Sequence, residues 1–106
     1  MRNYELTEVA QSDIDEILDF IAERKQNVDG AQAVLDYLHA AMQDLAEDPN
    51  RGHYRRDLTD RPVKFYRKSK EHKYYLVFDP DTRPVRILRV ASVRRDFVSL
   101  LEQSPW

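Results

Sequence analysis

Residues 63–90 read VKFYRKSKEHKYYLVFDPDTRPVRILRV, and this stretch decides the fold. It contains three runs of β-branched and aromatic residues of strand length, at 63–67, 74–78 and 85–90. The connections at 69–72 and 79–82 are short and turn-like. Because parallel strands need a longer crossover, the stretch predicts an antiparallel meander of three strands.

Two helical patterns precede the meander. Apolar residues recur on one helical stripe from Ala10 to Ile21 after Thr7, an N-cap residue, which predicts a helix over about 8–25. A second stripe predicts another helix that ends by about Asp48, before Pro49, and the spacing of Asp29 and Gln32 favours a capping box at its start. The short connection between the helices predicts an antiparallel hairpin.

The order of these elements indicates an α+β fold. An N-terminal strand at 4–6 and the meander form a mainly antiparallel sheet, the helical hairpin packs on one face of it, and a short C-terminal helix forms at 95–101. Residues 53–60 read as a polar connector. The chain has 106 residues and no internal repeat or long linker, so we expect a single domain over 1–106.

Composition excludes several classes of protein. Hydrophobic residues make up 42% and charged residues 34% of the chain, which rules out collagen-like and wholly disordered proteins. Cysteine is absent, which excludes disulfides, thiol catalysis and cysteine-ligated metals. No apolar run is long enough for a membrane span or a signal peptide, so we expect a cytoplasmic protein without membrane association.

The net charge of −2 hides an asymmetry between the two halves. Residues 1–50 contain 3 Lys/Arg and 12 Asp/Glu, whereas residues 51–106 contain 14 and 7. Such a split favours an anionic partner for the second half, or an acidic half that folds over the basic one and compensates it.

The usual signatures of catalysis are missing. The three histidines, His39, His53 and His72, have no metal-ligand spacing, and no phosphate-binding loop or nucleophile motif occurs. We therefore expect no metal and no cofactor. The carboxylates of the first helix read as a solvated face, since adjacent positions such as Asp15 and Glu16 project apart on a helix.

The basic residues of the second half carry more information. They lie on the first hairpin of the meander and on its last strand, interleaved with tyrosines. That pattern is compatible with a surface for phosphates and bases, with a groove for an acidic peptide, and with a plain solvated sheet face.

Ordered motifs over nearly the whole chain resemble the RelE/ParE superfamily of bacterial toxins. The opening Tyr4-x-Leu6-Thr7-x-x-Ala10-x-x-Asp13-Ile14-x-x-Ile17 carries the resemblance. So do Leu45-x-x-x-Pro49-x-x-Gly52, Tyr75-Leu76-Val77-Phe78, and Ile87-Leu88-Arg89-Val90 followed by Arg94-Arg95-Asp96. The resemblance implies the toxin of a type II toxin–antitoxin pair, neutralised by a ParD-like or similar antitoxin.

The superfamily divides by activity, and the differences favour the ParE-like branch. RelE-like members cut mRNA on the ribosome with basic sheet residues and a Tyr or His near the C-terminus, whereas ParE-like members inhibit DNA gyrase. This chain has Tyr75 where RelE-like enzymes carry an Arg, and Leu100 where they carry the C-terminal Tyr. We therefore expect a non-enzymatic gyrase inhibitor, with a RelE-like nuclease as the first alternative and an inactive toxin-fold binding protein as the second.

The interpretation assigns residues to two surfaces. We expect no catalytic residue, and no sequence-specific DNA binding by the toxin alone. The antitoxin would contact Tyr66 and Tyr75. The residues that would bind the target are Lys64, Arg67, Arg86, Arg89, Arg94 and Arg95.

Overall fold

The computed structural model describes residues 3–103 and contains a five-stranded sheet in the order β1-β5-β4-β3-β2. Strand β1 (Tyr4–Leu6) pairs in parallel with β5 (Val85–Ser92). Strands β4 (Tyr74–Asp79), β3 (Lys64–Tyr66) and β2 (His53–Tyr54) follow in antiparallel pairing. The predicted meander and N-terminal strand are thus confirmed, and the sheet is mixed because β1 is parallel.

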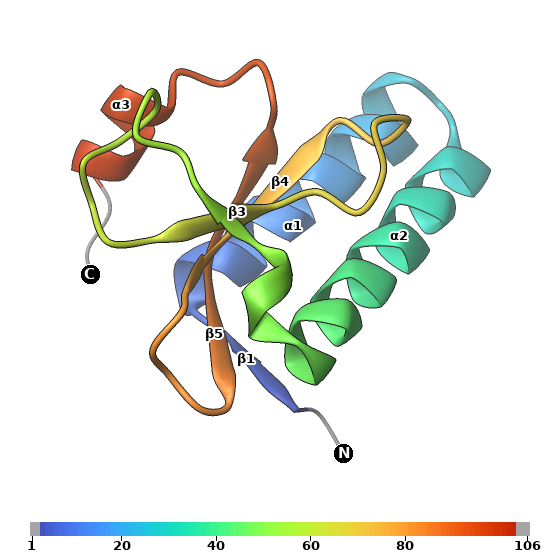
Figure 1. The fold of residues 1–106 in the computed structure, drawn as a ribbon. Helices are drawn as coiled ribbons and strands as arrows, with labels where there is room; N and C mark the ends of the chain where they lie inside the picture. Colours follow the sequence, from blue (N-terminus) through green and yellow to red (C-terminus); the bar gives the residue numbers. More distant parts are fainter. Residues whose placement is uncertain (1–2, 104–106) are drawn as a thin grey trace.

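The predicted helical hairpin is also present. Helix α1 (Glu8–Asp19) continues into a π-helical turn, η1 (Phe20–Arg24), and α2 (Val28–Glu47) returns beside it (Figure 1). Thr7 caps α1 as expected, since its hydroxyl accepts a hydrogen bond from the backbone N–H of Ala10 at 3.0 Å.

The predicted cap of α2 was wrong by two residues. The helix begins at Val28, and the side chain of Asn27 accepts a hydrogen bond from the N–H of Gly30 at 2.8 Å. Asp29 lies inside the first turn, where its charge suits the helix dipole. The side chain of Val28 is exposed, so it adds nothing to the apolar stripe that located the helix in the sequence.

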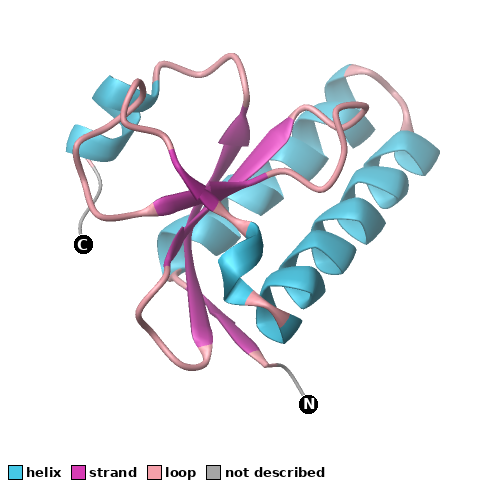
Figure 2. Cartoon of the chain, in the orientation of Figure 1, coloured by secondary structure: helices cyan, strands magenta, loops and turns pink. Residues whose placement is uncertain are grey.

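The predicted polar connector at 53–60 was wrong at its start, because it contains β2. The pairing of His53 with Phe65 and of Tyr54 with Lys64 adds this short strand to the sheet edge. The rest of the connector forms the β2–β3 loop, which runs beside helix α3 (Phe97–Glu102) (Figure 2). A 3-10 turn, η2 (Pro49–Arg51), joins α2 to β2.

The sheet carries a hydrophobic core on each face. On one face the hairpin packs against the sheet through residues such as Ile14, Leu38 and Met42, which meet Phe78 and Ile87. The other face is covered by α3 and by the β2–β3 loop. Its buried residues are Val63, Phe65, Val77, Leu88, Ala91, Phe97, Leu100 and Leu101.

One carboxylate fixes α1 to the edge of β5. Asp13 accepts hydrogen bonds from the Arg89 guanidinium at 2.8 and 2.9 Å and from the backbone N–H of Val90 at 3.0 Å. Strand β1 pairs with Val85, Arg86 and Ile87 of β5. Beyond the end of β1, the carboxylate of Asp13 accepts the hydrogen bond from the backbone N–H of Val90. In residues 3–103, none of the helices is long and apolar enough to cross a membrane.

Candidate functional site

Basic side chains line a groove at the β2–β3 edge of the sheet. The groove has a volume of about 410 Å³, and none of its lining residues is a carboxylate. We call this set the basic groove. Its lining residues are Arg51, His53, Arg55, Phe65, Tyr66, Arg67, Lys68, Ser69, Lys70 and Tyr75.

Strand alternation explains why these side chains meet. Side chains two residues apart on a strand point to the same face, so His53 and Arg55 share a face with Phe65, the partner of His53. Arg67, two residues after Phe65, continues this face and lies over the ring of Tyr75 on β4. The α3-side face of the sheet therefore gathers cations from two segments around one tyrosine.

Tyr75 is the centre of the groove wall. The guanidinium carbons of Arg55 and Arg67 lie 5.8 and 5.4 Å from its ring centroid. Its ring also makes edge-to-face contacts with Phe65 and Phe97 at 5.5 and 5.8 Å between centroids. Such cation–π and aromatic contacts hold the two guanidinium planes in place.

The guanidinium of Arg55 donates hydrogen bonds to two protein side chains. It donates hydrogen bonds to both carboxylate oxygens of Asp57, at 3.0 and 2.8 Å, and to the hydroxyl of Tyr75 at 2.6 Å. The hydrogen bonds with Asp57 are the main reason that the pKa of Arg55 is raised, and they lower the pKa of Asp57. Arg55 therefore supports the groove and leaves ligand contacts to its neighbours.

A second carboxylate anchors the groove to α2. Asp44 accepts a hydrogen bond from the Tyr66 hydroxyl at 2.9 Å, and its carboxylate lies 3.0 Å from Lys68 Nζ. Burial favours the neutral form of Asp44, but the hydrogen bonds from Lys68 and Tyr66 outweigh it and hold the pKa of Asp44 below its ordinary value. Burial, followed by the hydrogen bond to Asp44, raises the pKa of Tyr66.

The structure brings together only some of the residues predicted as sites. Arg67, Tyr66 and Tyr75 line the basic groove. Lys64 lies on the opposite face of β3 with its Nζ 5.1 Å from the ring of Tyr54. Arg86 is exposed on β5, with Nε 3.5 Å from a carboxylate oxygen of Glu5 on β1.

Arg89 has a structural partner. Its side chain is 13% exposed and that of Asp13 is 12% exposed, so this ion pair is largely shielded from water. An acidic half that compensates the basic one was one of the two interpretations of the charge asymmetry, and the pairing of Arg89 with Asp13 agrees with it. Its contribution to target binding stays a prediction.

Arg94 and Arg95 lie in the turn between β5 and α3. Both are exposed, and neither makes an ion pair with a residue in the described range 3–103. Their backbone N–H groups bond to Ser92, which orders the turn that carries them. They form a second basic feature, on a segment separate from those that line the basic groove.

The sequence interpretation missed several residues of the groove. His53 and Arg55 are two residues apart, a spacing that puts side chains on one face of an extended segment, whereas Arg51 belongs to the 3-10 turn η2. That alternation was the available signal, and the interpretation of 53–60 as an irregular connector concealed it. Lys68 and Lys70 were noted as basic without being assigned to a site.

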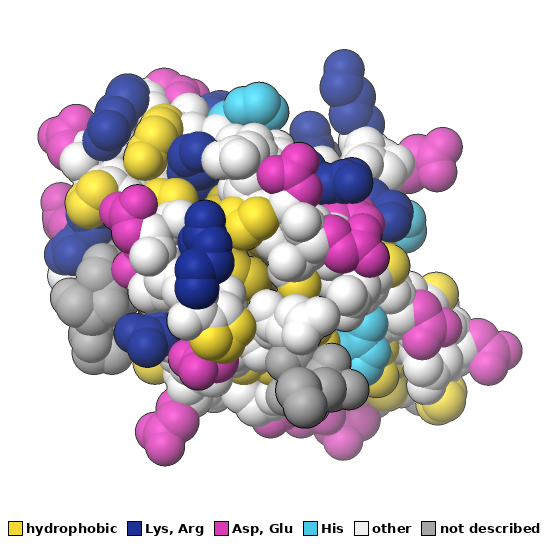
Figure 3. Space-filling model, turned by 60° about the horizontal axis from the view of Figure 1, so that its bottom comes forward, with side chains coloured by type: hydrophobic (Ala, Val, Ile, Leu, Met, Phe, Trp, Pro, Cys, Tyr) yellow, Lys and Arg dark blue, Asp and Glu magenta, His cyan; other side chains and the backbone are white. Residues whose placement is uncertain are grey.

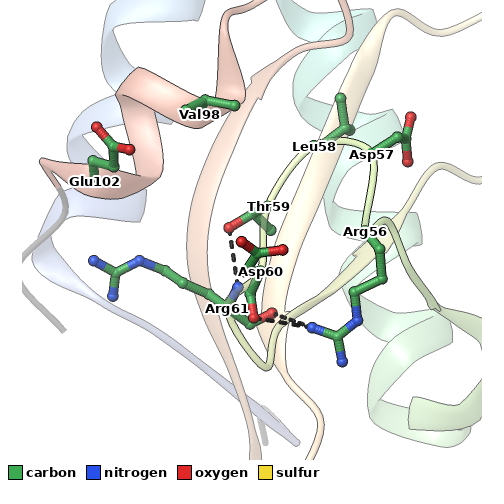
Figure 4. Close-up of a pocket in the computed structure, with 8 residues that line it drawn as sticks. All are labelled: Arg56, Asp57, Leu58, Thr59, Asp60, Arg61, Val98 and Glu102. Carbon is green, nitrogen blue, oxygen red and sulfur yellow. Dashed lines mark hydrogen bonds between the residues drawn. The ribbon is translucent and has the colours of Figure 1, made fainter.

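Another cavity, of about 450 Å³, lies between the β2–β3 loop and α3. Figure 4 shows Val98 and Glu102 of α3 on one side and the loop residues on the other. The guanidinium of Arg56 is directed at the backbone carbonyls of Asp60 and Arg61, at 3.0 and 3.4 Å. Acidic and basic side chains both line this cavity, so it lacks the single-sign charge of the basic groove.

Acidic and basic side chains are mixed on one face of the molecule. On the face drawn in Figure 3, Lys and Arg side chains are interspersed with Asp and Glu. Within residues 3–103, the ion pairs Lys68–Asp44, Arg86–Glu5 and Arg89–Asp13 each join a cation of the second half to an acid of the first. The two halves therefore compensate each other in part, and the basic groove keeps a local excess of positive charge.

The groove is chemically suited to bind an anion. Arginine and lysine donors face it without a lining carboxylate that would compete for them. His53 is the one imidazole in the lining and the group there best suited to acid–base chemistry. No group of three or more His, Cys, Asp or Glu side chains in the described part of the chain could hold a metal ion.

Comparison with known proteins adds a family. A family model described as the ParE toxin of the type II toxin–antitoxin system parDE matches residues 4–97. The match spans the sheet, the hairpin, the basic groove and both exposed arginines. A search of curated proteins finds no match to the chain.

Proposed function

Because the chain belongs to the ParE family of toxins of type II toxin–antitoxin systems, we propose that it acts by inhibiting DNA gyrase. The family implies a cognate antitoxin as its partner. The inhibition requires binding to gyrase or to the DNA that gyrase holds, and no catalytic step by the toxin.

The observation that carries the proposal, besides the family, is the pair of exposed arginines between β5 and α3. Arg86 and Arg89 have acidic partners on β1 and α1, whereas Arg94 and Arg95 have none among residues 3–103. An exposed ion pair contributes only about 0–1 kcal/mol in any case, so stability gives little reason for these two side chains. Contact with an acidic surface of gyrase or with its DNA is the alternative.

Two features of the site favour an inhibitor without catalysis. The basic groove has no carboxylate in its lining that could act as a general base. Leu100, at the position where RelE-like enzymes carry their C-terminal Tyr, is only 7% exposed and belongs to the core under α3. That position serves packing in this chain.

The experiment that tests the proposal measures cleaved DNA trapped by purified gyrase. We expect wild-type toxin to increase trapped double-strand breaks, and the variant R94Q/R95Q to lose at least tenfold in potency. Because both side chains are exposed, the melting temperature of the variant should stay within about 2 °C of wild type.

A matched control separates a contact from a general effect of charge. The variant R24Q/R83Q removes two positive charges from exposed positions elsewhere. We expect it to trap cleaved DNA as the wild type does. Equal loss of potency in both double variants would show that net charge matters and that the β5–α3 turn does not.

One observation favours a second candidate, the RelE-like mRNA nuclease. His53 lies among the cations of the basic groove, and imidazole can transfer the protons that RNA cleavage requires. Primer extension on a translated message tests this candidate. We expect no cleavage after induction, and codon-dependent cuts that disappear in H53Q would replace the gyrase proposal by the nuclease.

We further propose that the antitoxin neutralises the toxin by covering the sheet at Tyr66 and Tyr75. Both side chains line the basic groove, so an antitoxin segment that covers them would also close the groove to other ligands. Expression of the toxin alone should arrest growth, and co-expression of the antitoxin should restore it. Unimpaired growth without antitoxin would favour the inactive binding protein.

A further inference from the structure

We propose that the basic groove binds the phosphodiester backbone of a single nucleic-acid strand, with Arg67 as the direct phosphate contact. This goes beyond the proposed function, in which the groove is covered by the antitoxin and the free gyrase inhibitor holds no ligand there. The contact is with the backbone, so the binding is independent of base sequence.

Positive charge remains at the groove after internal pairing. Arg55 is held by Asp57, and Lys68 lies against Asp44. Arg67 and Lys70 make no ion pair with any of residues 3–103, although both line the groove. Their positive charge is therefore available to a ligand.

Arg67 is already positioned for this contact. Its guanidinium lies over the ring of Tyr75, and Tyr75 is fixed by Phe65, Phe97 and the hydrogen bond from Arg55. The cation–π contact restricts the side chain of Arg67, and the planar fork of its guanidinium can donate to two oxygens of one phosphate. Little conformational entropy is then lost when the anion binds.

The side chains that line the groove favour a nucleic-acid strand over a peptide. Protein interfaces depend on aromatic or aliphatic anchors that fill apolar pockets. Here Phe65 is 2% exposed, and the ring of Tyr75 is flanked by two guanidiniums. Cationic donors therefore flank the tyrosine ring on the groove wall, which suits a phosphate backbone better than an apolar peptide anchor.

The size of the groove favours a single strand over a duplex. A volume of about 410 Å³ lies near the lower end of the range for small-ligand sites. A flexible strand can place a few consecutive phosphates in such a space. A rigid duplex presents its phosphates on a convex surface and cannot enter it.

The test measures binding of a labelled single-stranded oligonucleotide to the purified full-length toxin by fluorescence anisotropy over a range of salt concentrations. DNA and RNA of the same sequence are separate arms, because either could supply the phosphates. Binding of either one that weakens as salt is raised is expected. The logarithm of the association constant should fall by about 0.7 per phosphate contacted for each unit of log salt.

Two single variants with the same change of charge make the test specific. R67Q should weaken binding at least tenfold and make the salt slope shallower by about 0.7. Arg83 lies in the turn between β4 and β5 and does not line the groove, so R83Q should change binding less than twofold. K70Q is a second groove variant and should weaken binding in the same direction as R67Q.

The inference is overturned if wild-type toxin binds neither oligonucleotide at low salt, or if R67Q and R83Q weaken binding equally. It is also overturned if a glutamate-rich peptide of equal charge binds more tightly than both oligonucleotides. These outcomes are independent of the gyrase proposal: a toxin that traps gyrase cleavage complexes but binds neither strand would remove the inference alone. A toxin that binds the strands but leaves gyrase unaffected would support it.

Discussion

At the scale of single residues, the contacts of Asp13 could not be predicted from the sequence. The carboxylates of the first helix read as a solvated face, and Asp15 and Glu16 are indeed exposed. Asp13 instead accepts three hydrogen bonds from β5. Periodicity separates apolar from polar faces, but it cannot tell which polar residue at the boundary meets a cation that lies 76 residues away.

The first prediction concerns this contact. D13N should lower the free energy of unfolding by about 2–3 kcal/mol, because it removes the carboxylate charge that the shielded guanidinium of Arg89 faces. Urea denaturation measures the change. D15N, at an exposed position whose side chain accepts a hydrogen bond from Gln11, should change the free energy by less than about 0.5 kcal/mol. Equal effects of the two variants would contradict the structural role of Asp13.

The second prediction is a pH dependence at Asp44. Its pKa is lower in the folded protein than in the unfolded chain, so its ionised form stabilises the fold above about pH 4, and that stabilisation is lost as pH falls through the folded pKa. D44N should therefore be about 1 kcal/mol less stable than wild type at pH 7. The difference should shrink as pH is lowered below about 4. A difference that stays constant down to pH 2 would contradict this account.

At the scale of secondary structure, the long periodic elements were predictable, whereas strand β2 and the cap of α2 were not. The α2 helix and strands β4 and β5 were located from apolar periodicity and β-branched runs. Strand β2 has two residues, which are too few to show an alternation of apolar and polar side chains. It forms because its backbone pairs with Phe65 and Lys64 at the edge of β3. The position at which a helix starts is sensitive to its capping hydrogen bond, so the sequence locates the start only to within a few residues.

The third prediction follows from the corrected cap of α2. N27A should lower the free energy of unfolding by about 1 kcal/mol, because the N–H of Gly30 loses its acceptor. D29A removes only a favourable charge from the first turn and should cost less, about 0.5 kcal/mol. Thermal unfolding of both variants measures the order. A larger loss of unfolding free energy in D29A than in N27A would support the capping box predicted from the sequence.

The candidate site was predictable to the same limited degree. A basic second half with interleaved tyrosines was compatible with an anion-binding surface or a plain solvated face, and the groove contains Arg67 and Tyr75 from that set. Asp57 holds Arg55 within one loop, whereas Asp44 of α2 holds Tyr66 and Lys68. The contacts of Asp44 depend on the assembled fold, so residue spacing could not indicate them.

At the scale of the whole molecule, the charge asymmetry of the chain is resolved in two ways. Three ion pairs of the described structure join acids of the first half to cations of the second, which ties the hairpin and β1 to the sheet. Positive charge that is not consumed in this way remains at the basic groove and at Arg94 and Arg95. This ParE-family toxin therefore presents uncompensated positive charge at two separate places on its surface.

The measurement that tests the account most directly is supercoiling of relaxed plasmid by purified gyrase titrated with purified toxin. We predict that the toxin abolishes supercoiling in a dose-dependent way and that prior addition of the cognate antitoxin restores it. R94Q/R95Q should require at least ten times more toxin for the same inhibition, while R24Q/R83Q should inhibit like the wild type. Supercoiling that proceeds unchanged at a large excess of wild-type toxin would contradict gyrase as the target.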